Sequence, residues 1–173
     1  KADSPVLERM IQGVLKEIHN SNRIDILPAT STAGAATHLA EVSTTYNVVE
    51  NNLSTKSFND STGIISFNWT YRVEGSVDLL ITEVETGKII TNRSIKGKGA
   101  SAENYQLTYK DTGWAKGKSQ QDEKEKQQLL TKAKSLLTNK SSNLYNSGAN
   151  AMITNLIAQS RFAPNQIFPY RLK

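Results

Sequence analysis

The chain has 173 residues, a length that suits one domain with one core. Hydrophobic residues make up 37% and charged residues 21%, which excludes a protein built mainly of membrane helices and a wholly disordered chain. The absence of cysteine excludes disulfide frameworks, thiolate metal sites and cysteine nucleophiles. Of the two histidines, His19 ends an expected helix and His38 has only Glu41 as an acidic neighbour. We therefore interpret both histidines as structural.

Basic residues are concentrated in one third of the chain. The formal net charge is +5, and residues 86–140 hold 12 Lys/Arg against 5 Asp/Glu, a net of +7. The rest of the chain holds 9 and 11, a net of −2. Such a region attracts lipid headgroups, nucleic acid or an acidic protein. The simpler alternative is a solvated helix face followed by a loop.

The N-terminal segment predicts a helix from Ser4 to about Asn20. Ser4 suits an N-cap, and Pro5 suits the first turn because its missing N–H costs nothing there. The apolar residues that follow keep helical spacing: Val6, Leu7, Met10, Ile11, Val14, Leu15 and Ile18. Residues 23–27 then predict a short strand that Pro28 stops.

The next segment gives weaker signals. Residues 31–45 are rich in alanine and predict a helix with a small apolar face. Residues 48–63 are mostly polar, and we expect them to be partly loop.

The strongest signal is a period-2 alternation that starts at Ile64. The apolar positions are Ile65, Phe67, Trp69, Tyr71, Val73, Val77, Leu79 and Ile81. The phase survives Gly75, so one long strand with a kink there is favoured over a hairpin that turns at Glu74–Ser76. Glu85-Thr86-Gly87-Lys88 predicts a tight turn, and a return strand runs from Ile89 to about Lys98.

Residues 100–118 predict an extra strand with a mobile connection, a candidate functional loop. Aromatic residues in a polar, basic segment are typical of surfaces that contact partners. The candidate partner-binding residues are Tyr105, Tyr109, Trp114, Lys116 and Lys118.

Two helices are expected at 120–138 and 142–160, with one helix interrupted near Asn139–Ser142 as the alternative, followed by an extended tail over 162–170. Together these elements predict an α/β (α+β) fold in one three-layer domain over residues 1–173. Its mostly antiparallel sheet contains a long hairpin, about 64–99, covered by the N-terminal and C-terminal helices.

No catalytic, metal or cofactor site is predicted. The chain lacks G-x-S-x-G, P-loop, H-E-x-x-H and EF-hand patterns. Glu83 and Glu85 could serve a hydrolase, but their place beside a turn favours exposed structural residues. Trp69 and Tyr71 could stack bases, but the apolar row that they share favours the core.

Three stretches resemble one known family: Leu7–Leu27, Val77–Ile90 and Ala151–Pro169, together about a third of the chain. The first is a helix leading into a short strand, the second a strand, a Thr-Gly turn and a return strand, and the third a final helix with a Phe-Pro ending. This order looks like the curli secretion component CsgG and its soluble relatives, including the LpoB-type activators of penicillin-binding proteins. The family's opening strand has no counterpart after Lys1, so we expect it upstream or absent.

The resemblance implies a non-enzymatic, often lipid-anchored protein of the periplasm or outer membrane, acting by protein–protein binding in secretion or cell-wall assembly. Because the sequence begins at Lys1 rather than Met, we expect a form from which a leader has been removed, and the resemblance implies that this form is exported. The expected partner is a cell-envelope protein, with a homo-oligomer or an anionic membrane surface as further possibilities. The alternative functions are a subunit of an oligomeric outer-membrane secretion pore and a nucleic-acid-binding domain.

Overall fold

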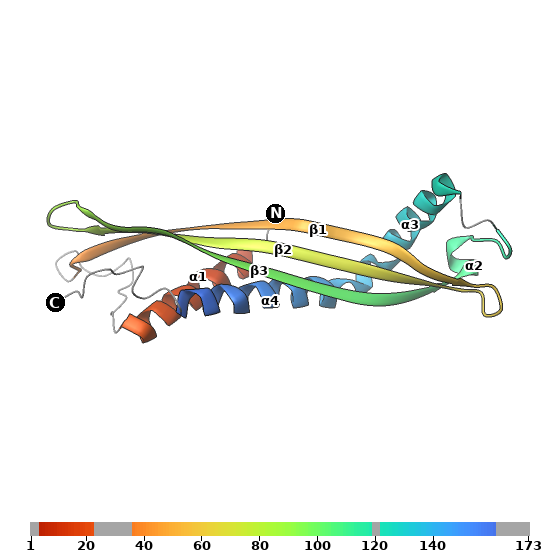
Figure 1. Ribbon diagram of the computed structural model, residues 1–173, viewed down its shortest axis with the longest axis horizontal. Helices are drawn as coiled ribbons and strands as arrows, with labels where there is room; N and C mark the ends of the chain where they lie inside the picture. The colour runs from red at the N-terminus through yellow and green to blue at the C-terminus, as the bar shows by residue number, and fades with distance from the viewer. Residues whose placement is uncertain (1–3, 23–35, 119–121, 162–173) are drawn as a thin grey trace. The chain divides into compact units, whose positions relative to one another are not determined.

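The fold is a three-stranded antiparallel sheet with flanking N- and C-terminal helices, which confirms the predicted α+β class. The computed structural model describes residues 4–22, 36–118 and 122–161 (Figure 1). The strand order is β1-β2-β3. In chain order the elements are α1 (Ser4–Asn22), β1 (His38–Asn59), β2 (Ile64–Glu83), β3 (Ile89–Thr108), α2 (Tyr109–Thr112), α3 (Glu123–Leu137), a 3₁₀ turn (Thr138–Lys140) and α4 (Ser142–Arg161).

β1 corrects the two predictions made for the segment before Ile64. A weak helix over 31–45 and a loop over 48–63 were expected, but His38–Asn59 is one strand. Val42, Thr44 and Tyr46 are half-buried and alternate with exposed neighbours, as side chains do on a pleated strand. β-branched and aromatic residues favour such a surface, and here they outweigh the alanines at the start of the segment. The tight turn from β1 to β2 uses Gly63, at φ 64°.

β2 confirms the long strand that passes through Gly75, and the alternative turn at Glu74–Ser76 is wrong. The predicted turn before Ile89 is also present, with Gly87 at φ 70°. β3, however, runs on to Thr108 rather than ending near Lys98. Gly97 lies within β3 because α4 passes close to its backbone, so it permits packing rather than marking a strand end.

The N-terminal helix, α3 and α4 form where helices were predicted. The predicted strand over 23–27 and the tail over 162–170 lie outside the described residues. In those described, the strands and helices supply two layers, so the third layer stays a prediction.

The residues divide into two compact units. Unit 1 comprises 1–47, 73–99 and 149–173, and unit 2 comprises 48–72 and 100–148. Each strand therefore contributes residues to both units. The single domain over 1–173 stays a prediction.

In unit 1, α1 and α4 cover the apolar face of β2 and β3 (Figure 1). Gly75 lets the tips of Met10 and Met152 lie against the strand, and the side chain of Ile157 lies against Gly13. The backbone N–H of Lys98 also donates to Asn155 Oδ1 of α4 at 2.9 Å. The buried apolar residues of this unit are Met10, Val14, Ile18, Val73, Val77, Leu79, Ile81, Ile95, Ala149, Met152, Ile153 and Leu156.

In unit 2, the same face of β2 carries an aromatic cluster. The ring of Trp69 lies edge-on to Tyr105 and Tyr145, with centroids 5.9 and 6.0 Å away. Tyr71 meets Tyr145 at 4.7 Å, and Gly148 of α4 leaves room for the Tyr71 ring. Trp69 and Tyr71 are only 1% and 6% exposed, which confirms that they belong to the core. The remaining buried apolar residues of unit 2 are Leu53, Ile65, Phe67, Leu107, Trp114, Leu129, Ala133, Leu137 and Leu144.

The close approach at Gly97 predicts that Gly97→Ala will destabilise the protein more than Gly75→Ala. A Cβ at Gly97 would lie 2.7 Å from the Met152 carbonyl oxygen and 2.8 Å from the Leu156 nitrogen, which are helix backbone atoms. A Cβ at Gly75 would meet only flexible methionine tips. We expect a loss of about 2 kcal/mol at Gly97 and less than about 1 kcal/mol at Gly75, measured by urea unfolding. Equal losses would contradict this packing of α4 on β3.

Candidate partner-binding surface

Residues 100–118 were expected to hold an extra strand and a mobile connection, but residues 100–108 continue β3 and residues 109–112 form the short helix α2. β3 extends to Thr108, whose hydroxyl oxygen accepts a 3.0 Å hydrogen bond from the Asp111 N–H and so caps α2. Gly113 ends the short helix at φ 72°, where glycine is favoured. The Thr112 hydroxyl donates back to the Thr108 carbonyl at 3.0 Å. Local hydrogen bonds therefore stabilise α2 at its start and at its end.

Tyr105 and Tyr109, two of the candidate residues, each donate their hydroxyl to a carboxylate of the same chain. Tyr105 of β3 donates to Glu103 Oε2 at 2.5 Å, and burial together with this bond raises the pKa of the Tyr105 hydroxyl well above its usual range. Tyr109 of α2 donates to Asp60 Oδ1 at 2.6 Å, and this bond raises the pKa of Tyr109 to about 12. Both hydroxyls therefore stay protonated at neutral pH and act as donors.

Trp114 packs inside unit 2 instead of standing out from a loop. Its side chain is 8% exposed, and its ring lies 5.1 Å from that of Phe58. Lys118 Nζ lies 5.3 Å from the same ring and 3.0 Å from Glu125 Oε1. Lys118 thus joins this segment to α3 and Trp114 joins it to β1, and of the five candidates Lys116 is the one left exposed. That these five residues bind a partner stays a prediction.

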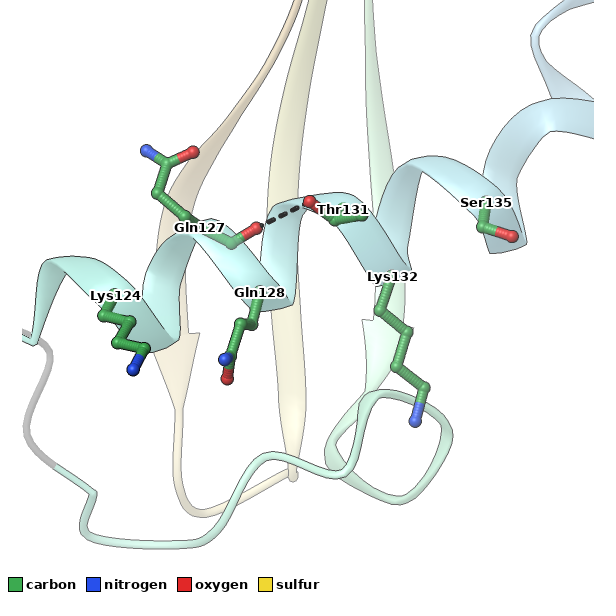
Figure 2. Close-up of a pocket in the computed structure, with 6 residues that line it drawn as sticks. All are labelled: Lys124, Gln127, Gln128, Thr131, Lys132 and Ser135. Atoms are coloured by element: carbon green, nitrogen blue, oxygen red, sulfur yellow. Dashed lines mark hydrogen bonds between the residues drawn. The ribbon is translucent and has the colours of Figure 1, made fainter.

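The structure adds a surface that the sequence analysis missed, on the exposed side of α3. Six residues line a shallow hollow there: Lys124, Gln127, Gln128, Thr131, Lys132 and Ser135 (Figure 2). Lys124, Gln128 and Lys132 are four residues apart and point to the same side of the helix in Figure 2. Lys132 Nζ would lie 3.6 Å from a Cβ at Gly113, which puts it beside the end of α2. Helical spacing of polar residues was the available signal.

The acidic residues near the start of α3 are already engaged. Asp122 caps the helix by accepting from the Glu125 N–H at 3.2 Å, and Glu125 pairs with Lys118. Glu123 lies 3.9 Å from Lys126. Within the described part of the chain, Lys116, Lys124 and Lys132 have no carboxylate within ion-pair distance. We name these three residues the lysine surface.

The other candidate chemistry lies elsewhere. The Thr86 hydroxyl donates to Glu83 within the β2–β3 turn, and Glu85 is exposed at the same turn. His38 has its ring nitrogen 2.9 Å from the Thr37 hydroxyl. Among the residues described, no group of three His, Asp or Glu is placed to hold a metal ion. No helix in the described ranges is both long and apolar enough to cross a membrane.

The placement of Trp114 predicts a stability effect that Lys116 will not share. Trp114→Ala removes a ring packed against Phe58 and Lys118, so we expect a loss of about 3 kcal/mol in the free energy of unfolding. Lys116→Ala removes an exposed side chain, so we expect a change within about 0.5 kcal/mol. Urea unfolding of both variants tests this. A similar small change in both would place Trp114 on the surface instead.

Comparison with known proteins gives no indication of function. Neither a scan against protein-family models nor a search of curated proteins finds a match for this chain. The likeness to the CsgG family therefore stays a prediction carried by the three stretches named above.

Proposed function

We propose that this chain is a non-enzymatic accessory protein of the cell envelope that binds a partner protein through the lysine surface, in secretion or cell-wall assembly. The envelope setting comes from the family resemblance. The binding role is supported by the side chains of unit 2, where tyrosines, a tryptophan and one lysine are used in packing while other lysines face solvent.

The observation that carries the proposal is the contrast between Lys118 and its basic neighbours. Lys118 contacts the Trp114 ring and pairs with Glu125. These contacts order the segment around Lys118 before a partner binds, so binding loses less conformational entropy there. Lys116, Lys124 and Lys132 extend from this ordered base without a carboxylate of their own within the described chain. A helix that presents unpaired cations suits recognition of a partner of opposite charge.

The partner is expected to present carboxylates that match the lysine surface. Charge pairs at the rim of an interface raise the association rate and weaken with salt. Polar neighbours such as Gln127, Gln128 and Thr131 can add hydrogen bonds to the same partner. The nucleic-acid alternative relied on the high pI and on Trp69 and Tyr71 as stacking residues, and the burial of these two side chains removes the second support.

Photocrosslinking from the lysine surface tests the proposal. A benzoylphenylalanine in place of Gln128 should give one discrete crosslinked protein in cells that make this chain. The double variant Lys124→Glu/Lys132→Glu should abolish that product, since reversed charges repel an acidic partner. Immunoblotting of the irradiated envelope fraction is the measurement.

Matched controls separate the surface from total charge and from folding. Lys16→Glu/Lys96→Glu changes the net charge equally at two other exposed positions and should leave the crosslink intact. Far-ultraviolet circular dichroism should match wild type for both double variants. A crosslink that survives reversal at 124 and 132, or that joins only lipid or nucleic acid, would overturn the proposal.

A further inference from the structure

β1 is an edge strand, and in unit 2 its outer side is paired with no described strand. It pairs with β2 on one side, and no other strand of the described sheet lies beyond it. The part of β1 in unit 2 spans residues 48–59 and contains neither proline nor glycine. Val48 and Val49 are 51% and 47% exposed. Long edges of this kind pair with further strands unless charge, proline or a cover prevents it.

Two carbonyl contacts show which backbone groups face outward. The Asn52 carbonyl accepts a 3.4 Å hydrogen bond from the Thr70 hydroxyl of β2, so it is directed to the inside of the sheet. The Asn51 carbonyl accepts from Lys134 Nζ of α3 at 3.4 Å. Successive carbonyls of a strand point in opposite directions, so the odd residues 51, 53 and 55 direct theirs away from β2. The lysine contact is exposed and can give way to a backbone N–H.

The side chains of this segment are complementary to themselves in one antiparallel register. Leu53 lies midway between Glu50 and Lys56, so pairing about Leu53 places Glu50 of each copy opposite Lys56 of the other. The same register places Val48 opposite Phe58 and Asn52 opposite Ser54. Residues that lie opposite each other in a sheet point to the same face. Side chains alternate between the two faces, so both members of each pair must be even-numbered or both odd-numbered, and all three pairs meet this condition.

Glu50 is held by two contacts to β2, and its carboxylate has acceptor capacity left for a second copy. Its Oε1 accepts the Thr70 hydroxyl at 2.7 Å, and its Oε2 lies 3.0 Å from Arg72 Nε. A carboxylate can accept further bonds beyond these two. Lys56 is exposed, and in the described chain no carboxylate pairs with it.

From these observations we propose that the β1 edge of unit 2 binds the same edge of a second copy of this chain, antiparallel about Leu53. The two-fold pairing uses the outer edge of both copies, so it closes at a dimer rather than growing into a fibre. The lysine surface is not part of the pairing, so the proposal is independent of the proposed function.

Cysteine pairs in the cysteine-free chain test the register. Residue 52 of one copy lies opposite residue 54 of the other in a non-hydrogen-bonded pair, which is the type of antiparallel pair with the shorter distance between side chains. Asn52→Cys/Ser54→Cys should therefore form a covalent dimer on mild oxidation, seen on non-reducing gels. Asn52→Cys alone should not, because its copies lie diagonally apart. Equal crosslinking of the two variants would overturn the register.

Sedimentation equilibrium of the unmodified chain tests the dimer itself. We expect a monomer–dimer equilibrium, and Lys56→Glu should weaken it about tenfold because two attractive pairs become repulsive. Lys16→Glu, a reversal on α1, should leave the equilibrium unchanged. Thermal melting of Lys56→Glu at low concentration should match wild type, since its partner lies on the other copy. A wild-type monomer at every concentration would overturn the proposal and leave the edge to a different protein.

Discussion

Burial of one face of β2 is the constraint on which the rest of the structure depends. Every second residue from Ile65 to Ile81 faces the same side, and these residues are nearly all apolar. A row of that length must be covered, because exposed apolar area is unfavourable by roughly 25 cal/mol per Å². Helices cover it in both units, and glycines let them approach: Gly75 and Gly97 in unit 1, and Gly148 in unit 2.

Because this face of β2 is covered, the groups available for binding a partner lie on the surface. In unit 2, the hydroxyls of Tyr105 and Tyr109 bond to carboxylates, and Trp114 joins the packing. Tyr109 and Trp114 thereby hold residues 109–114 against Asp60 and Phe58 of the β1–β2 hairpin. Among the groups that remain exposed in the described part of unit 2 are lysines of α3 and the outer backbone of β1. Both features suit binding by complementary charge and by strand pairing.

The elements with strong periodicity could be predicted from the sequence. The alternation of β2 and the stripe of α1 each repeat over many residues, so a local pattern was enough. β1 could not be predicted in this way. An edge strand buries little, and polar residues such as Asn51, Asn52 and Ser54 hide its alternation. The predicted end of β3 was wrong because Gly97 is needed for the close packing of α4, which is distant in the sequence, and does not end the strand.

The candidate surface was predictable in part. The concentration of positive charge over residues 86–140 pointed to the correct region for exposed lysines. The role of each aromatic residue depended on contacts between distant positions, such as Phe58 with Trp114 and Asp60 with Tyr109. Sequence neighbours that are polar made Trp114 look exposed, whereas its ring is covered by residues from other elements.

Amide hydrogen exchange followed by nuclear magnetic resonance is the most direct test of the central claim. If the covered face of β2 holds the protein together, the amides of β2 around Trp69 and Val77 will exchange slowest in the chain, at rates that follow global unfolding. If these amides exchanged as fast as those of residues 48–59 in β1, the account would be contradicted, because the apolar face of β2 would then open without global unfolding.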